Sequence, residues 1–310
     1  MKDKKQIIRA NGKLLLSAEY FILDGAKAIA LPCQLGQIFS FEKIPNQDSI
    51  VWKSFDHKKQ LWFEGIFNKK NLNIVSSNHE ATAQRLTQIL QAVQHINPRF
   101  LKEEEGLTVE SHLEFPRIWG LGTSSTLIYS IAQWAQIDPF ILLEKTFGGS
   151  GYDIACAGVK NSISYQIIDQ KPVWEKVNFN PQFTDQIYFI FLGKKQNSRE
   201  GIQHYRATKK SEDLVQKFST LSKNFLEAQS LIEFENYIEQ HETLISSTLN
   251  LPKVKELYFS DFWGKIKSLG AWGGDFVLAT SDKTEEETKQ YFNEKGFDVF
   301  LKYSELILEA

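Results

Sequence analysis

Residues 116–126, PRIWGLGTSST, constrain the fold of this chain more than any other stretch. Gly120 and Gly122 let the backbone approach a ligand closely, and the hydroxyl residues after them lead into a segment that predicts a helix. Amide groups at the start of a helix bind anions. The stretch lacks the lysine of a P-loop, however, and neither G-x-x-x-x-G-K-[ST] nor G-x-G-x-x-G occurs in the chain. The local pattern is therefore consistent with an unusual anion site or with an ordinary capped helix.

Composition narrows the classes of protein that fit. The chain has 310 residues, enough for two domains, and 42% of them are hydrophobic, as in soluble globular proteins. The net charge of −2 gives no reason to expect a nucleic-acid partner. Cys33 and Cys156 are too few for a disulfide framework and predict buried thiols in a reducing compartment. Since no apolar stretch is long enough to span a membrane, we expect a cytoplasmic protein without a membrane partner. We expect it to be a monomer or a homodimer.

The first 180 residues predict a mixed α/β domain. Around the turn dipeptide Asp24-Gly25, apolar or alternating runs predict strands at 14–16, 28–31, 36–41 and 50–55. Helices are expected at 81–97, with Pro98 just past the end, and at 125–136, 139–148 and 154–158, and further strands at 107–113, 163–168 and 173–177. The polar segment 178–184, which contains Pro181, is the expected boundary of this domain.

Residues 181–310 predict a smaller α+β domain. Its expected order is a strand at 186–193, helices at 211–249 and 252–269, a strand at 276–280, a helix at 283–295 and a strand at 298–303. This order indicates a small antiparallel sheet covered by helices, a ferredoxin-like arrangement. The expected fold class is therefore α+β with two domains, 1–180 and 181–310.

Three further stretches carry candidate functional residues. Lys13 begins the apolar run KLLL, where a lysine either faces solvent or meets a carboxylate or phosphate. Asp153 follows the glycine turn GGSG and either caps the next helix or reaches a cleft to accept a proton. Glu144, nine residues earlier, is a metal ligand or part of a polar helix face. In GAWGGD, residues 270–275, small residues either end a helix or let a ligand or the other domain approach the backbone.

Together, and in this order, these stretches resemble the motifs of the GHMP kinases, the superfamily of galactokinase, homoserine kinase, mevalonate kinase and phosphomevalonate kinase. PRIWGLGTS is similar to the family's P-x-x-x-G-L-G-S-S phosphate loop. NGKLLLSAEYFILDG, residues 11–25, is similar to the first motif of the mevalonate and phosphomevalonate kinases. GSGYD, residues 149–153, resembles the segment that carries their catalytic aspartate, and GYDIA marks a subgroup of the superfamily. GAWGGD resembles the third motif, so the resemblance spans nearly the whole chain.

The resemblance implies a kinase that uses ATP and Mg²⁺ to phosphorylate a small molecule. Asp153 would be the base or orienter for the attacking hydroxyl, and Lys13 would stabilise the developing charge. The residues implied around the ATP phosphates are Gly120, Leu121, Gly122, Thr123, Ser124 and Ser125. The implied metal ligands are Ser124 and Glu144. The implied substrate and third-motif residues are Glu19, Arg199, Gly270, Ala271, Gly273 and Gly274.

Three residues depart from the family's pattern. Ala18 replaces a glycine of the first motif, and Trp272 and Asp275 replace glycines of the third. An aspartate close to phosphates repels them unless a metal intervenes. The expected acceptor is mevalonate or phosphomevalonate, in isoprenoid synthesis. The alternatives are a lyase similar to diphosphomevalonate decarboxylase, a sugar or homoserine kinase, and a nucleotide-binding protein without activity.

Overall fold

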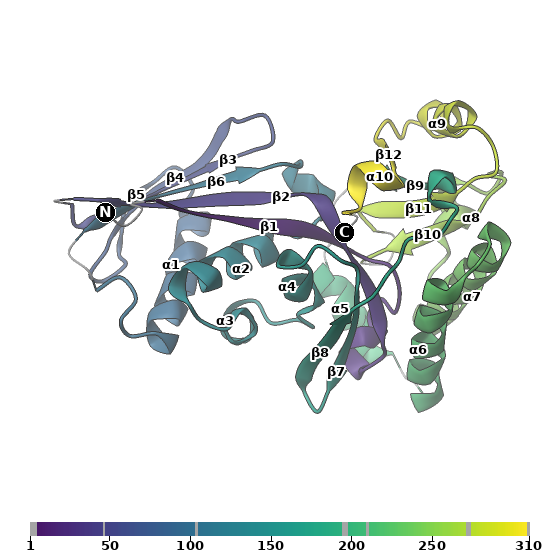
Figure 1. The fold of residues 1–310 in the computed structure, drawn as a ribbon, viewed down its shortest axis with the longest axis horizontal. Coiled ribbons are helices and arrows are strands. Elements are labelled where there is room, and N and C mark those ends of the chain that lie inside the picture. Colours follow the sequence, from purple (N-terminus) through teal and green to yellow (C-terminus); the bar gives the residue numbers. More distant parts are fainter. Residues whose placement is uncertain are drawn as a thin grey trace. The chain divides into compact units, whose positions relative to one another are not determined.

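The chain divides into two compact units in this computed structural model, which describes residues 5–45, 47–102, 105–193, 198–208, 211–270 and 274–308. The first unit consists of Met1–Gly12, Leu35–Arg117 and Leu121–Gly158. The second consists of Lys13–Gln34, Ile118–Gly120 and Val159–Ala310. Strands β1 (Lys5–Leu15) and β2 (Ala28–Ile44) contribute residues to both (Figure 1).

The first unit is a sheet with helices along one side of it (Figure 1). Its strands follow the order β5-β4-β3-β6-β2, in which β3 and β6 are parallel and the other pairs antiparallel. The bounds are β3 Ser49–Phe55, β4 Leu61–Asn68, β5 Ile74–Ser77 and β6 Gly106–Leu113. The helices are α1 Glu80–Ile96, α2 Thr123–Ala135, α3 Pro139–Thr146 and α4 Tyr152–Ala157.

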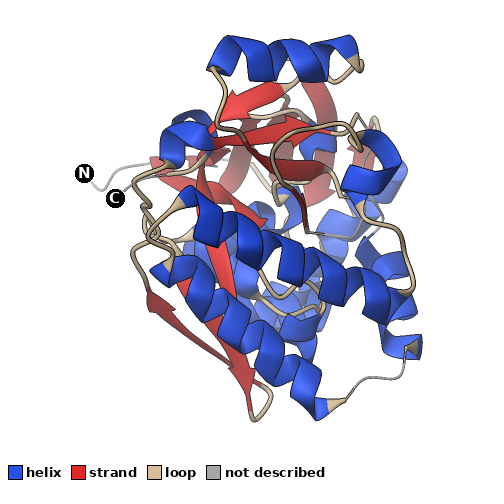
Figure 2. Ribbon diagram, turned by 90° about the vertical axis from the view of Figure 1, so that its right-hand side faces the viewer, coloured by secondary structure: helices blue, strands red, loops and turns tan. Residues whose placement is uncertain are grey.

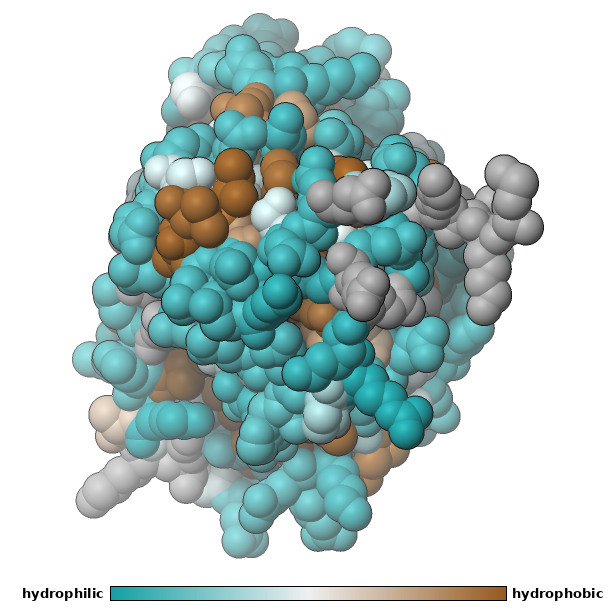
Figure 3. All heavy atoms as spheres, turned by 90° about the vertical axis from the view of Figure 1, so that its left-hand side faces the viewer, coloured by the Kyte–Doolittle hydropathy of each residue, from teal (hydrophilic) through white to brown (hydrophobic). Residues whose placement is uncertain are grey.

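The core of the first unit follows from two sequence periods. Every second residue of β3 is buried, so that Trp52 faces the interior while its neighbours are half-exposed. In α1 the buried residues Leu86, Ile89, Leu90 and Val93 recur at helical spacing. The face seen in Figure 3 is mainly hydrophilic, with a limited number of hydrophobic side chains.

The second unit contains a four-stranded antiparallel sheet in the order β10-β11-β9-β12. The strands are β9 Ile187–Phe191, β10 Ile266–Leu269, β11 Phe276–Thr280 and β12 Phe300–Lys302. Its helices are α5 Ser198–Ala207, α6 Glu212–Glu227, α7 Leu231–Leu249, α8 Val254–Tyr258, α9 Glu285–Glu294 and α10 Tyr303–Leu306. The two long helices α6 and α7 lie side by side (Figure 2). A hairpin of β7 (Ile163–Ile168) and β8 (Lys171–Lys176) extends from the first residues of β2.

The expected α+β fold class is confirmed, but one helix predicted in the second unit is wrong. The sequence predicted a helix at 252–269, whereas the structure has only the short helix α8 and then strand β10. Gly264 explains the change. A Cβ there would stand 1.8 Å from the carbonyl oxygen of Thr280, so the chain at 264 runs directly against the backbone of β11's last residue. The segment IKSL then pairs with β11 as a fully buried strand.

Neither unit is a continuous stretch of sequence, because β1 and β2 pass through both. The expected division at residue 180 therefore stays a prediction. Within the described residues, no helix combines the length and the apolar character that crossing a membrane requires.

Candidate active site

The glycine loop lies where the chain passes from the second unit to the first, between Gly120 and Leu121. Helix α2 begins at Thr123, two residues earlier than the sequence predicted, and its N-cap is Gly122 in the left-handed region at φ 97°. A glycine N-cap has no side chain to occupy the first amides of the helix. The start of this 13-residue helix therefore combines uncapped N–H groups with the positive end of the helix dipole, which suits an anion.

The hydroxyl side chains of the loop divide into two groups. Those of Thr123 and Ser124 line a pocket, and Ser124 is exposed. The Ser125 side chain is buried and donates to the carbonyl oxygen of Gly122 at 2.8 Å. Thr126 is also buried and donates to Gln37 Oε1 on β2 at 2.7 Å. Thr123 and Ser124 thus offer oxygens to a ligand, whereas Ser125 and Thr126 shape the turn.

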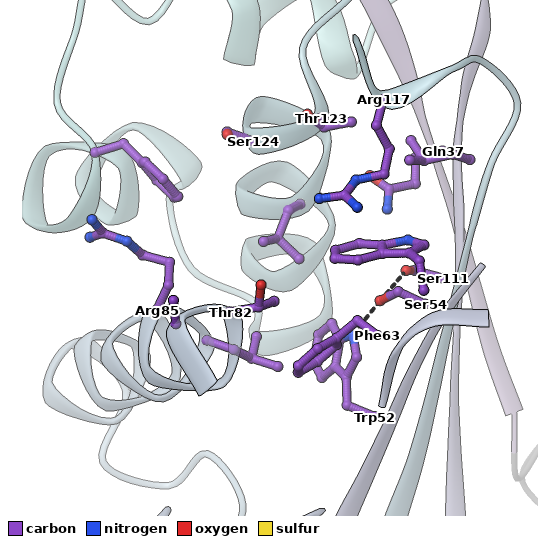
Figure 4. Close-up of a pocket in the computed structure, with 16 residues that line it drawn as sticks. Gln37, Trp52, Ser54, Phe63, Thr82, Arg85, Ser111, Arg117, Thr123 and Ser124 are labelled. Carbon is purple, nitrogen blue, oxygen red and sulfur yellow. Dashed lines mark hydrogen bonds between the residues drawn. The ribbon is translucent and has the colours of Figure 1, made fainter. Parts of the chain in front are cut away.

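The pocket beside the loop lies wholly in the first unit and has a volume of about 300 Å³. Figure 4 shows its aromatic wall, with Trp52 and Phe63 contributed by β3 and β4. A short polar chain crosses this wall. The indole N–H of Trp52 donates to Ser54 Oγ at 3.2 Å, and the Ser111 hydroxyl donates to the same oxygen at 2.9 Å. Because Ser54 Oγ accepts both bonds, its own proton is left for another acceptor.

Two arginines also line the pocket. The guanidinium carbon of Arg117 lies 3.6 Å from the ring centre of Trp62, and that of Arg85 lies 5.1 Å from the ring centre of Phe147. Burial lowers the pKa of Arg117, and the nearby charge of Asp56 opposes this. Neither arginine was expected from the sequence. The only local signal was the position of Arg117 directly after Pro116 in the loop motif.

In the second unit, two charged side chains converge on Gly120. The Lys13 ammonium donates to the carbonyl oxygen of Gly120 at 3.1 Å. On the other side, a Cβ built on Gly120 would stand 1.7 Å from Asp275 Oδ2, so the carboxylate lies against the glycine itself. Gly120 is also in the left-handed region, at φ 67°. The loop that lacks its own lysine is therefore contacted by one from β1.

Asp153 lies in the first turn of α4 and is half-buried in the first unit. Its carboxylate accepts from the amide of Ile154 at 3.0 Å. Its interpretation as the helix cap is wrong, because the N-cap is Gly151, again in the left-handed region. Lys13 belongs to the second unit and Asp153 to the first, so their expected pairing stays a prediction.

The expected metal ligands are oxygen donors, which is the chemistry that Mg²⁺ prefers. Glu144 is exposed on α3, and Ser124 is exposed at the start of α2. Among the described residues, no three His, Cys, Asp or Glu side chains are grouped to hold a metal ion. A site formed by Ser124 and Glu144 together with phosphate oxygens stays a prediction.

The third glycine motif is described in part. Gly270 follows β10 in the left-handed region, and Gly274 is buried before β11. Ala271, Trp272, Gly273 and the side chain of Arg199 lie outside the described residues.

Glu19 lies in the interior of the second unit with three charged or titratable neighbours that the sequence analysis missed. Lys267 on β10 donates to Glu19 Oε1 at 2.6 Å, and His241 Nε2 on α7 lies 2.9 Å from Glu19 Oε2. Glu242 lies 3.9 Å from Lys267 Nζ and 3.7 Å from His241 Nδ1. All four side chains are at most 3% exposed. We call Glu19, His241, Glu242 and Lys267 the buried quartet.

The charge state of Glu19 is set by its neighbours. Burial by itself raises the pKa of this carboxyl, but the positive charge of Lys267 and the contact with His241 more than offset that and lower it to about 2. Glu19 is therefore ionised at any pH near neutrality.

No protein-family model matches the chain, and neither does any curated protein. Solved structures match over nearly its whole length. Mevalonate kinase of Methanococcus jannaschii has a TM-score of 0.70 at 13% identity, over 100% of both chains. Phosphomevalonate kinase of Streptococcus pneumoniae, solved with phosphomevalonate and AMPPNP, has a TM-score of 0.69 at 15% identity, over 96% of this chain and 99% of that one. This chain has the GHMP kinase fold.

Galactokinase of Lactococcus lactis, solved with galactose, has the GHMP kinase fold too and matches with a TM-score of 0.67 at 11% identity, over 99% of this chain and 96% of that one. The fold expected from the motifs is thus confirmed. Kinases with different acceptors match almost equally well, so the fold alone does not select an acceptor.

Proposed function

We propose that this chain is an ATP-dependent kinase that phosphorylates a hydroxyl group of a small molecule, with mevalonate or phosphomevalonate as the acceptor. The observation that carries the proposal is the 3.1 Å hydrogen bond from Lys13 to Gly120. It brings a positive charge to a glycine loop that has uncapped helix amides but no lysine of its own. Phosphoryl transfer depends mainly on positioning and on neutralising phosphate charge, and these groups supply both.

The pocket beside the loop is the proposed site of the nucleoside part of ATP. Its aromatic wall offers flat apolar faces on which a base can stack. Ser54 and Ser111 add a hydroxyl that can donate to a ring nitrogen. Thr123 and Ser124 line the same pocket, so a nucleotide whose base lies there has its phosphates at the start of α2.

The proposed chemistry assigns a role to each motif side chain. Asp153 orients the acceptor hydroxyl and takes its proton, and Lys13 stabilises the negative charge that develops on the transferred group. Mg²⁺, held by Ser124 and Glu144, supplies further neutralisation of the phosphate charge when bound. Gly120 admits Asp275 because it has no side chain, while its carbonyl oxygen accepts from Lys13.

The identity of the acceptor is a separate part of the proposal. The motif AEYFIL after Lys13, together with GSGYD, supports a mevalonate-type acceptor, and phosphomevalonate most of all. The likeness to galactokinase supports a sugar kinase as the second candidate. Both candidates require the same loop, lysine and aspartate and differ only in the molecule that provides the hydroxyl.

The experiment is ADP release by the purified full chain with ATP and Mg²⁺, measured with mevalonate, its phosphate, its diphosphate, galactose and homoserine. We expect release that depends on mevalonate or phosphomevalonate and is abolished in Asp153→Asn. Release with galactose alone would select the sugar kinase. Release of CO₂ with the diphosphate would select the lyase instead, and nucleotide binding without ADP release from any acceptor would show that the protein is not a kinase.

A further inference from the structure

Ala18 and Tyr20, on either side of Glu19, both have backbone conformations that non-glycine residues rarely adopt. Their φ angles are 60° and 63°, in the left-handed region. Such a conformation persists only where the surroundings hold it, and it is enriched at functional sites. The turn that follows β1 is therefore held in its shape by the groups packed against it.

His241 and Lys267 of the buried quartet contact this turn directly. His241 Nε2 accepts from the amide of Ala18 at 3.1 Å and lies 2.9 Å from Glu19 Oε2. The same ring nitrogen therefore contacts two consecutive residues of the turn. Lys267 fixes the other oxygen of Glu19 at 2.6 Å.

The segment between Lys13 and this turn is fixed as well. The amide of Leu16 donates to the carbonyl oxygen of Ile29 at 2.8 Å, and the amide of Ile29 donates to Ser17 Oγ at 2.9 Å. The Ser17 hydroxyl is also 2.7 Å from that of Ser222 on α6. These bonds and those of the quartet hold one continuous segment, residues 16–19, which directly follows the strand that carries Lys13.

The quartet also holds the strand that leads towards Asp275. Lys267 is the second residue of β10, and it donates to the carbonyl oxygen of Ser268 at 2.9 Å. The amide of Ser268 donates in turn to Glu242 Oε2 at 3.2 Å. Strand β11 lies next to β10 in the sheet, with Leu269 paired to Phe276. Asp275 immediately precedes β11 in the chain. The segments that bring Lys13 and Asp275 to Gly120 are therefore joined to each other through the buried quartet.

We propose that the buried quartet is a positioning device that sets the place of Lys13 at Gly120, and that its ion pair serves turnover more than stability. The inference rests on the proposed kinase function for its catalytic consequence. A buried ion pair adds little to stability compared with an apolar pair of similar size, whereas removing one partner is costly because it leaves a charge unpaired.

The test is a double-mutant cycle on the Glu19–Lys267 pair, with Glu19→Gln, Lys267→Met and the double variant. Each single variant should lower the urea midpoint of unfolding by about 1 M. Lys267→Met should lower it more, because it leaves both carboxylates without their cation, whereas Glu19→Gln leaves Lys267 beside Glu242. The double variant should recover part of the midpoint lost in Lys267→Met, because only Glu242 then lacks the cation.

Measuring kcat distinguishes a positioning role of the quartet from a purely stabilising role. In the double variant we expect kcat to stay about 10- to 100-fold below the original value, with KM for ATP changed by less than about threefold. The matched control is Glu239→Gln on α7, the helix that also carries His241 and Glu242. This variant breaks the bonds to Lys253 and Lys265 at 2.6 and 3.0 Å. It should lower the midpoint and leave kcat unchanged. Recovery of kcat together with the midpoint in the double variant would overturn the proposal.

Amide hydrogen exchange keeps the inference testable if the kinase function fails. If the original protein releases no ADP with any acceptor, the function is refuted but the positioning is not. The amides of residues 14–18 should then still exchange at least about tenfold faster in the double variant than in Glu239→Gln. Equal exchange in the two variants would overturn the positioning role by itself.

Discussion

At the scale of single residues, Gly120 shows why the loop must contain a glycine. It has φ 67°, its carbonyl oxygen accepts from Lys13, and Asp275 occupies the space that a Cβ would need. Backbone conformation and space therefore exclude other residues independently of each other. The two glycines of GLG also have different tasks, since Gly122 instead leaves the first amides of α2 uncapped.

Gly120→Ala, alone and combined with a second change, distinguishes the requirement for a positive φ from the requirement for space. We expect it to lower turnover at least about 100-fold, because its methyl group displaces Asp275 and with it the geometry around Lys13. The added change Asp275→Gly removes the clash but leaves the backbone strain, and should restore only part of the lost turnover. Steady-state ADP release is the measurement. Full activity in Gly120→Ala would mean that the loop adopts another conformation in the working protein.

At the scale of elements, sequence periodicity predicted the parts that are locally determined. Helices α1, α2 and α9 and the strands β7 and β11 lie close to where the sequence analysis expected them. Strand β10 was missed because its four residues, two apolar and two polar, fit a helix as well as a strand, and its partner β11 decides between them.

The candidate site shows the same division between local and long-range information. The motif residues Lys13, Gly120 and Asp153 could be found from short patterns with characteristic glycines. The pocket could not, because β3, β4, β6, α1 and α2 each contribute only one or a few residues to it. His241 and Glu242 look like polar residues of an exposed helix face, and only the folded packing buries them.

A pH prediction belongs to the turn that carries Glu19. The pKa of this carboxyl is about 2 in the folded protein and near 4.5 in the unfolded chain, so the unfolded chain takes up the proton first as the pH falls. The stabilisation is complete above about pH 4.5 and is lost as the pH falls towards 2. The difference in pKa corresponds to about 3 kcal/mol.

Urea unfolding at pH 7, 5, 4 and 3 measures this effect. The original protein should lose stability between pH 5 and 3 more steeply than Glu19→Gln, whose free energy of unfolding lacks the Glu19 contribution. Glu239 also has a pKa lowered to about 2, through its bonds to Lys253 and Lys265, but it is partly exposed and should contribute less. Parallel curves for the two proteins would contradict the ionised, buried state of Glu19.

At the scale of the whole molecule, the candidate residues are distributed over the two units. The first unit contains the pocket, the start of α2 and Asp153, and the second contains Lys13, Asp275 and the buried quartet. The chain crosses between the units inside the glycine loop itself, at residues 120 and 121. The glycine loop itself provides only amides and hydroxyls, and the lysine that contacts it, Lys13, lies on β1.

The central claim is that Lys13 supplies the charge that the glycine loop lacks, and Lys13→Met tests it most directly. Turnover of ATP with the accepted substrate should be measured beside the affinity for a non-hydrolysable ATP analogue, with Lys27→Met as the control for loss of a lysine elsewhere in the second unit. We predict a fall in kcat of at least about 100-fold in Lys13→Met, a much smaller change in analogue affinity, and no fall in the control. A Lys13→Met protein that turns over ATP at nearly the original rate would contradict the account.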